Sequence, residues 1–422
     1  MTGPSDTAEV RRNNLALVLR AIAARDSVSR TTLRATTGLV STSVSTLVDD
    51  LLARGLVLDD GASAPTGPGR PRRQVRLNSK RVVTTTVHLT RLEITGEIRD
   101  FSGEVLWQQR SKPAIRRGVT DDLVDAIASM LDDAQQVAAA LPGAWAHPPV
   151  VGLPGPVIDQ RVSAGIPVFR IDQFDLVEAL GRRRPGHPET IVVNVGRLAA
   201  YGEYAAMPPE QRPQSVAYFA TGTESLMGGL VMDGAVYLGS HSMAGETGHV
   251  SVSLDGARCI CGLNGCLETY LGLPYLLPNA GMENYAERGS IDEAMDALIA
   301  LLKERDDRAV AAVERAGAAL ATAIGSVGGL LDVELIILGG AIARLAPWLT
   351  PAIDEFLDAR SAVVPGCIPR LQLASVGRDA PRIGAWRLAR QEILDDPSQI
   401  PIMDAKGDPI HPHHQPANRS SR

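Results

Sequence analysis

The sequence predicts an α/β protein with a small helical domain at its amino terminus. Within the first 80 residues, apolar positions recur at helical spacing three times before two short strand-like runs. From residue 82 to residue 394, strand-like runs alternate with amphipathic helices, which is typical of an α/β body. A chain of 422 residues can bury two or three cores, so we expect domains at 1–80 and 81–395 and a disordered, Pro-, His- and Ser-rich tail at 396–422.

The three helices expected in the first domain have the arrangement of a helix-turn-helix. Apolar residues mark the first helix over residues 15–22. Ser29 can cap a second, short helix that ends at Gly38. Ser41 can cap a third helix, whose buried stripe runs over residues 44–51. Helix, short helix, glycine-containing turn and helix is the pattern of a DNA-binding helix-turn-helix.

The stretch after the third helix predicts a wing. Short strands at residues 55–58 and 74–77 flank a Gly/Pro-rich loop that contains Gly69-Arg70-Pro71-Arg72-Arg73. Flexible arginines beside Pro and Gly suit a narrow minor groove, where negative potential is concentrated. A solvated linker is the alternative for this loop alone. Joined to the three helices, the pattern favours DNA.

The charge distribution also favours a polyanion as the partner of the first domain. Residues 1–80 carry a net charge of +5, whereas the rest of the chain carries −11. At the start of the third helix, small polar side chains can reach base edges or phosphates. The candidate contacts to double-stranded DNA are Arg30, Ser41, Thr42, Ser43, Ser45, Thr46, Arg70, Arg72 and Arg73.

The elements expected in the body follow the change of pattern at residue 82. Strands are expected at 82–89, 93–100, 105–110, 190–195, 216–221, 229–237, 334–338 and 370–376, and an apolar run with Pro and Gly lies at 149–157. Helices are expected near 121–141, 176–183, 196–207, 308–331, 347–359 and 382–394.

No membrane segment is expected. The longest weakly polar run, at 316–331, is shorter than a bilayer requires, and no apolar amino-terminal segment with a basic flank is visible. We therefore expect a cytoplasmic protein, in which cysteines stay reduced.

Three of the four cysteines lie within eight positions, and this clustering predicts a metal site. His249 precedes Cys259, Cys261 and Cys266, and one His with three Cys supplies the four ligands of tetrahedral zinc. Buried free thiols are the simpler alternative, but three of four cysteines would not gather by chance at such spacing. Disulfides are disfavoured because Cys259 and Cys261 are too close in the chain to bridge easily. The expected cofactor is therefore one structural Zn²⁺.

The same stretch resembles the ROK family, named after repressors, open reading frames and sugar kinases. The matching motifs are GETGH at residues 245–249 and CICGLNGCLE at residues 259–268, and the resemblance extends from about residue 13 to residue 394. It implies an actin-like, two-lobed sugar kinase-like body behind a winged helix, with a structural zinc beside a sugar pocket between the lobes. The sugar contacts that it implies are Asn194, Glu246, His249 and Glu268.

The positions at which family kinases perform phosphoryl transfer hold different residues here. The first phosphate turn of such kinases is an Asp-x-Gly-Gly-Thr sequence, but here the chain reads Val-His-Leu-Thr-Arg-Leu at residues 87–92. The glycine-dense second turn corresponds to residues 221–226, where Glu224 would place negative charge near a triphosphate. Val195 stands where the catalytic Asp would follow Asn194, and valine accepts no proton.

These observations predict a DNA-binding transcription regulator, with a repressor as the expected kind, that senses a sugar or sugar derivative and is not an enzyme. No catalytic residue is predicted, and a homodimer or homotetramer is expected. One alternative is an ATP-dependent sugar kinase with a fused DNA-binding domain. The other is a regulator whose body no longer binds sugar and serves oligomerisation or partner contact.

Overall fold

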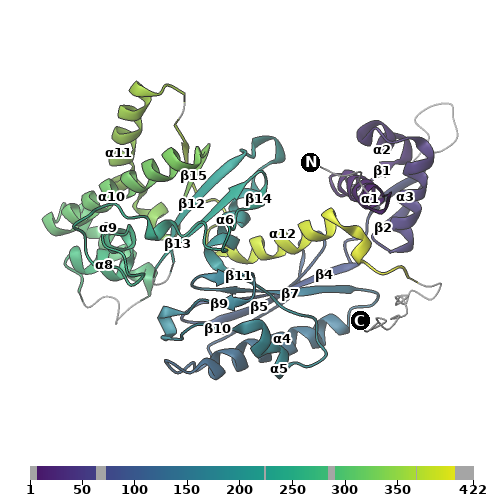
Figure 1. The fold of residues 1–422 in the computed structure, drawn as a ribbon, viewed down its shortest axis with the longest axis horizontal. Coiled ribbons are helices and arrows are strands. Elements are labelled where there is room, and N and C mark those ends of the chain that lie inside the picture. Colours follow the sequence, from purple (N-terminus) through teal and green to yellow (C-terminus); the bar gives the residue numbers. More distant parts are fainter. Residues whose placement is uncertain (1–6, 63–72, 223–224, 284–289, 367, 404–422) are drawn as a thin grey trace, which may run out of the picture.

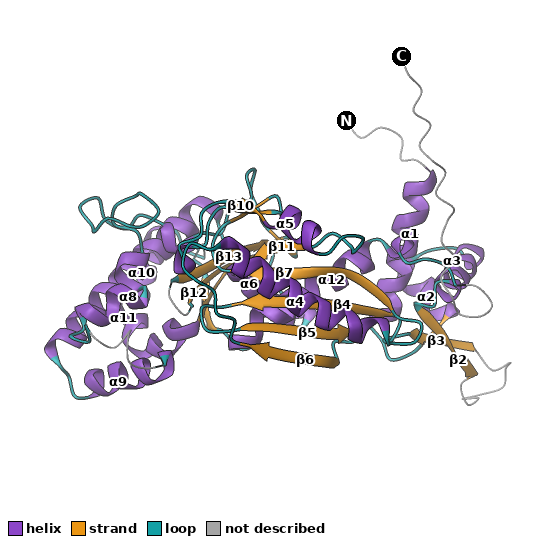
Figure 2. Ribbon diagram, turned by 90° about the horizontal axis from the view of Figure 1, so that it is seen from below, coloured by secondary structure: helices purple, strands orange, loops and turns teal. Residues whose placement is uncertain are grey.

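The computed structural model describes residues 7–62, 73–222, 225–283, 290–366 and 368–403. Figure 1 shows a small amino-terminal domain, here called the head, beside a two-lobed body. Helix α12 extends from the body toward the head, and Figure 2 gives the same arrangement from below.

The head is a winged helix. Its elements are α1 (Thr7–Ala23), β1 (Val28–Ser29), α2 (Arg30–Thr37), α3 (Ser41–Ala53), β2 (Val57–Ala62) and β3 (Arg73–Leu77). Strands β2 and β3 pair antiparallel, and β1 adds to β3 as the third strand. The expected loop arginines Arg70 and Arg72 lie outside the described residues, whereas Arg73 begins β3.

The ends of α2 agree with the sequence prediction, but the start of α3 does not. The hydroxyl of Ser29 accepts a hydrogen bond from the amide of Thr32 at 3.1 Å, and Gly38 ends α2 at φ 73°. The cap of α3 was predicted wrongly: the position before the helix is Val40, and Ser41 is its first helical residue. A serine in the first turn resembles a cap in sequence, because both positions favour small polar residues.

The first lobe of the body contains a five-stranded sheet. Its main strands and helices are β4 (Val82–Leu89), β5 (Ile94–Asp100), β6 (Val105–Ser111), α4 (Thr120–Ala139), β7 (Trp145–Leu153), α5 (Leu176–Arg183) and β11 (Ile191–Asn194). The strand order is β11-β7-β4-β5-β6, with β4, β5 and β6 antiparallel and β7 and β11 parallel to β4. A small sheet of β8 (Val157–Ile158), β9 (Val162–Ser163) and β10 (Phe174–Asp175) lies in the connection between β7 and α5, together with η1 (Pro167–Phe169).

The second lobe repeats this topology. Its sheet has the order β14-β13-β12-β15-β16, again with three antiparallel strands followed by two parallel ones. The strands are β12 (Ser215–Thr221), β13 (Leu226–Met232), β14 (Ala235–Val236), β15 (Leu335–Gly339) and β16 (Arg370–Leu373). The helices are α7 (Glu268–Leu271), α8 (Leu273–Asn279), α9 (Ile291–Lys303), α10 (Asp307–Leu331) and α11 (Gly340–Val363), with η3 (Thr247–His249) after β14. Two copies of one five-stranded order form the predicted actin-like body.

Two elements of the second lobe differ from the sequence prediction. The strand expected at residues 229–237 is a hairpin of β13 and β14, because Asp233 and Gly234 turn the chain at positive φ. The helix expected at 347–359 begins directly after β15 and contains Pro347 and Pro351. Proline normally marks a helix start, so the earlier turns of α11 were missed.

Two helices, α6 (Val195–Ala206) and α12 (Ala380–Asp395), pack against each other between the lobes and the head. Short turns η2 (Pro209–Gln211) and η5 (Gly377–Asp379) follow α6 and precede α12, respectively. Figure 1 shows α12 ending beside the head.

The prediction that a disordered tail begins at residue 396 was wrong. Residues up to 403 are described, and they include η6 (Pro397–Gln399). Ile400 is fully buried in the core of the head, where it packs with Ile393 and Leu394 of α12. Ile400 lies in a short segment with three prolines and polar residues between 396 and 410, which gave no periodic apolar signal.

By length and composition α10 could cross a membrane, but more than half of its apolar stretch is buried inside the body. Its buried side chains belong to the core of the second lobe. Helix α10 is therefore a core helix, as the sequence predicted for residues 316–331.

Candidate functional site

The four predicted metal ligands lie together. His249 ends η3, and the three cysteines follow in the loop before α7. Their ligand atoms all lie within 4.8 Å of one another. Nδ1 of His249 is 3.6 Å from Sγ of Cys259, and Sγ of Cys261 is 3.5 Å from Sγ of Cys266. All three cysteines are free thiols.

These separations fit one tetrahedral metal ion. With metal–sulfur bonds of about 2.3 Å, neighbouring ligand atoms of a tetrahedron lie roughly 3.5–3.8 Å apart. Burial raises the pKa of the Cys259 thiol, and it raises that of Cys266 to about 12. A divalent cation would supply the positive charge that allows these buried thiols to ionise. The His/Cys₃ cluster can therefore hold a metal.

The loop that carries the cysteines depends on a glycine in a close contact. The amide of Cys259 donates to the carbonyl of Leu263 at 2.8 Å, and this bond closes a turn over residues 259–263, just before Cys266. Gly265 adopts φ 62°, and a Cβ there would collide with the carbonyl oxygen of Ser253. Any larger residue at 265 would move Cys266.

Glu268 lies beside the start of β13, and the GETGH loop that carries Glu246 lies along the same strand. Glu268 is buried, and its Oε2 accepts a hydrogen bond from the amide of Leu226 at 2.7 Å. A Cβ on Gly248 would lie 2.7 Å from Cβ of Leu226 and 3.4 Å from Oε2 of Glu268, so the GETGH loop closes directly over this carboxylate. The structure therefore brings the two motifs together.

Burial shifts the pKa of the three predicted sugar contacts in these motifs, Glu246, His249 and Glu268. It raises the pKa of Glu268 to about 7 and also raises that of Glu246, against the opposing effect of Arg197. It lowers the pKa of His249, which favours the neutral imidazole that binds metals. Buried carboxylates of this kind serve as acceptors for hydroxyl groups.

Asn194, the remaining predicted sugar contact, caps α6. Its Oδ1 accepts from the amides of Gly196 at 2.7 Å and Arg197 at 3.2 Å, and its Nδ2 donates to the carbonyl of Gly155 at 2.8 Å. The side chain thus fixes the start of α6 against the first lobe. A ligand contact at Asn194 stays a prediction.

Arg197 is a site residue that the sequence analysis did not single out. It is only 2% exposed, and its guanidinium lies 3.7 Å from Oε1 of Glu246. Nε donates to the carbonyl of Ala244 at 3.2 Å, and the two Nη atoms donate to the carbonyls of Val157 and Ser242. The sequence signal for Arg197 was a single charged residue in the apolar run Val-Gly-Arg-Leu-Ala-Ala. Such a residue is buried with the run, and a buried arginine requires several acceptors.

Adjacent glycines in β13 allow both α6 and the GETGH loop to pack closely against this strand. A Cβ on Gly228 would lie 2.8 Å from the amide nitrogen of Thr247, and one on Gly229 would lie 3.0 Å from Cα of Arg197. Paired glycines inside a strand often mark such a close approach of backbone, and this signal was also missed.

The positions of kinase chemistry are filled differently. The turn between β4 and β5 is closed by Thr90, whose Oγ1 accepts from the amides of Leu92 at 3.3 Å and Glu93 at 3.1 Å. Those amides therefore point at a side chain and not at a phosphate. Val195 is 5% exposed, and a Cβ on Gly152 would lie 3.3 Å from its Cγ1. Glu224 lies outside the described residues.

The candidate DNA contacts of the head are grouped on α2 and α3. Ser41, Thr42 and Thr46 are exposed, while Ser43 and Ser45 are half-buried. Oγ1 of Thr46 donates to the carbonyl of Thr42 at 3.1 Å within the helix.

The predicted arginine contacts of the head that the structure describes are both paired with acids. Arg30 forms an ion pair with Asp49 at 2.7 Å, which braces α2 against α3. Arg73 lies 3.6 Å from Asp59 across the wing strands, and its side chain is 80% exposed. Because these pairs are exposed, both arginines can exchange their partner for a phosphate.

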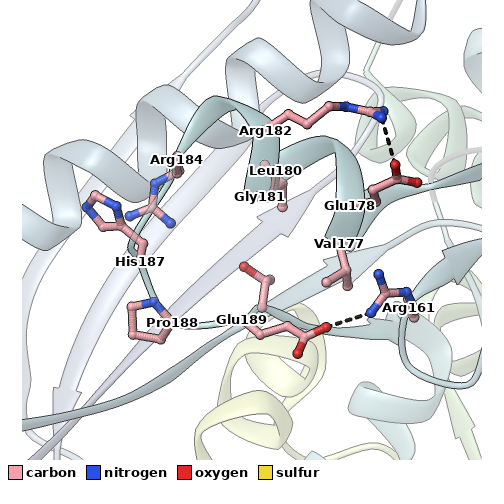
Figure 3. A pocket seen from close by; sticks show the side chains of 11 residues that line it. Arg161, Val177, Glu178, Leu180, Gly181, Arg182, Arg184, His187, Pro188 and Glu189 are labelled. Atoms are coloured by element: carbon pink, nitrogen blue, oxygen red, sulfur yellow. Dashed lines mark hydrogen bonds and ion pairs between the residues drawn. The ribbon is translucent and has the colours of Figure 1, made fainter. Parts of the chain in front are cut away.

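A separate pocket of about 400 Å³ lies beside α5 in the first lobe (Figure 3). Its arginines already have acidic partners: Arg161 pairs with Glu189 at 2.6 Å and Arg182 with Glu178 at 2.8 Å. None of the predicted sugar contacts lines this pocket.

A winged helix joined to an actin-like body with a His/Cys₃ cluster defines a class of sugar kinase-related regulators. The chain belongs to the ROK family, whose model matches residues 85–392. It is similar to the xylose repressor of Bacillus spizizenii, with 23% identity over 396 residues that cover 93% of this chain and 98% of the repressor.

Two solved structures share the fold. A ROK family transcriptional regulator, described as a homologue of the Escherichia coli MLC protein, superposes with a TM-score of 0.75 at 23% identity, covering 92% of this chain and 97% of that one. A ROK hexokinase from Thermus thermophilus superposes with a TM-score of 0.59 at 24% identity, covering 74% of this chain and 99% of the hexokinase. The regulator matches head and body, whereas the hexokinase matches a smaller share of the chain.

Proposed function

We propose that this protein is a DNA-binding transcription regulator, a repressor, whose body senses a sugar or sugar derivative without phosphorylating it. One observation carries the proposal: the carboxylates and the His/Cys₃ cluster of the body are in place, while Val195 and the closed Thr90 turn occupy the positions of phosphoryl transfer. The similarity to a xylose repressor along almost the whole chain supports it.

The winged helix supports DNA as the partner. Helix α3 presents exposed Ser41, Thr42 and Thr46 at its start, where a recognition helix contacts base edges. We assign DNA binding to residues 1–80 and effector binding to the ROK body. Because one head makes few contacts, a symmetric dimer or tetramer in the cytoplasm would bind two half-sites.

Zinc is the metal that we propose for His249, Cys259, Cys261 and Cys266. Thiolate and imidazole ligands with tetrahedral spacing suit Zn²⁺. The ion would hold the cysteine loop and the GETGH loop together beside Glu246, a structural role.

The test of DNA binding uses the wing. Binding sites are first mapped across the genome with the full-length protein, and a duplex from the strongest site serves as the probe. Arg70→Ala/Arg72→Ala should weaken binding and reduce its dependence on salt, since each lost phosphate contact lowers the number of released counterions. Lys112→Ala/Arg117→Ala, which removes two exposed cations of the body, is the control. Unchanged affinity and salt slope in the first double variant would remove the wing from the interface.

A kinase with a fused head is the second candidate, because a ROK hexokinase shares the fold of the body. A coupled assay with ATP and a panel of hexoses and amino sugars separates the two. Turnover by the unmodified protein would overturn the regulator proposal. If no sugar shifts the melting temperature while DNA binding is intact, the body is an oligomerisation scaffold.

A further inference from the structure

Arg197 connects the two lobes at the proposed effector site. Val157 belongs to the first lobe, whereas Ser242 and Ala244 lie in the loop between β14 and η3 of the second lobe. The guanidinium donates to the carbonyls of all three residues and faces Glu246 as well. A charge so deeply buried needs each of these acceptors, because an unpaired one is costly in a protein interior.

Helix α6, which carries Arg197, is fixed to α12 by contacts of backbone against backbone. A Cβ on Gly202 would collide with the carbonyl oxygen of Ala380, and one on Gly384 would collide with that of Leu198. Glu203, 1% exposed, anchors the middle of α6. Its carboxylate accepts from the amides of residues 375–377 at 2.8–3.1 Å, directly before α12. These contacts leave no room for α6 to shift without α12.

The far end of α12 is part of the head. Ile393 and Leu394 lie in the same core as α1 and α3, together with Ile400. Arg54 at the end of α3 donates to the carbonyl of Ser398 at 2.9 Å, and the amide of Met403 donates to the carbonyl of Ala53 at 2.9 Å. Figure 1 shows α12 extending from α6 to the head.

We propose that Arg197 is a positioning residue that holds Glu246 and connects its state, through α6 and α12, to the DNA-binding head. A ligand hydroxyl that donates to Glu246 competes with the guanidinium for the carboxylate. The guanidinium of Arg197 then moves away from Glu246 toward its carbonyl acceptors, and α6 moves with it. Because α6 and α12 touch through glycines, and α12 ends in the core of the head, the displacement reaches α1 and α3. The proposal rests on Glu246 being part of the effector site.

Hydrogen exchange of the full-length protein tests this link without an effector or DNA. Three variants are compared with the wild type: Arg197→Met, Glu246→Gln and the control Arg184→Met. Arg184 is also a buried arginine, 6% exposed, but it pairs with Asp132 of α4 at 2.7 Å. Arg197→Met should speed exchange about tenfold in residues 238–250, and also in the last turns of α12 and in α1. Glu246→Gln should give the same pattern with smaller amplitude, since the amide still accepts a hydrogen bond.

Two results would overturn the link. The first is faster exchange confined to residues 238–250 in Arg197→Met, which would leave Arg197 as a local brace of the loop. The second is a change in the head of equal size in Arg184→Met, which would show a general loss of stability. If Arg197→Met does not fold, the same comparison is made with Arg197→Lys and Glu246→Gln. Lysine keeps the positive charge of arginine but lacks its planar set of donors. Failure here leaves DNA binding and effector binding untouched, because neither is measured.

Discussion

The two sides of the proposed effector site differ in whether their polar groups already have partners. On the side of the metal cluster, Glu268 is a buried carboxylate and Glu246 a half-buried one, both have raised pKa values, and four metal-binding atoms converge. On the side of the first phosphate turn, the amides are bonded to Thr90, and an apolar Val195 faces Gly152.

Under the proposed function, this difference explains how a kinase-like fold can bind a sugar without phosphorylating it. Hydroxyl acceptors and a metal cluster need oxygen, nitrogen and sulfur atoms held at suitable positions, and here Glu268 and the His/Cys₃ cluster supply them. A phosphate cradle needs free backbone N–H groups, and here the neighbouring side chain has taken them.

The largest effect is expected from the metal side. Cys261→Ser should lose the metal, because a serine hydroxyl replaces a thiolate ligand, and the loop that carries Gly265 should then unravel. Elemental analysis of protein purified without chelator should give one zinc per chain for the wild type and none for the variant. Cys367→Ser, a residue outside the described part of the chain, should keep the metal. Full zinc in Cys261→Ser would contradict the proposed ligand set.

Gly384→Ala should have the next largest effect on the protein, because the substitution disturbs the contact between α12 and α6. The new Cβ collides with the carbonyl of Leu198, so the free energy of unfolding should fall by about 3 kcal/mol. Gly181→Ala is the matched control, because a Cβ there meets nothing within 4 Å and alanine favours the helix. Urea unfolding of both variants gives the comparison. Equal stability of the two would mean that the helices can separate without cost.

These two sites illustrate what the sequence could and could not predict. The His/Cys₃ cluster was predictable, because ligand chemistry fixes both residue type and spacing, and periodicity predicted most of the longer strands and helices. Arg197 was not, because its role depends on carbonyl groups from residues 157, 242 and 244, which only the tertiary fold brings together.

The same limit explains the errors at the ends of elements. Ile400 looked like part of a polar tail, yet it completes a core built from residues almost 400 positions earlier. Residues 87–92 were predicted only to lack the phosphate-turn sequence, and the structure shows that Thr90 closes this turn with its own hydroxyl.

A smaller effect is expected from His88 on the phosphate side. Burial, with Arg382 nearby, lowers the pKa of His88 to about 4. The unfolded chain binds this proton at about pH 6.5. The folded pKa is therefore depressed, so the stability present above pH 6.5 should be lost as the pH falls toward 4, by about 2–3 kcal/mol. His88→Gln should remove this loss in urea titrations between pH 7 and pH 4.5. The exposed His187→Gln is the control, and an unchanged pH dependence in His88→Gln would contradict burial as the cause.

The smallest expected effect is that of Val195→Asp on phosphoryl transfer. A general base typically contributes a factor of about 10²–10⁴, but it acts only on a nucleotide that is already held in place. The amides of Leu92 and Glu93 would still be bonded to Thr90, and an Asp at a position that is 5% exposed beside Gly152 would have a raised pKa. ATP-dependent turnover of hexoses in a coupled assay should therefore stay at the background of the wild type, while the zinc content is retained. Turnover in Val195→Asp would contradict this expectation. It would show that the catalytic base is the one part that the phosphate side lacks.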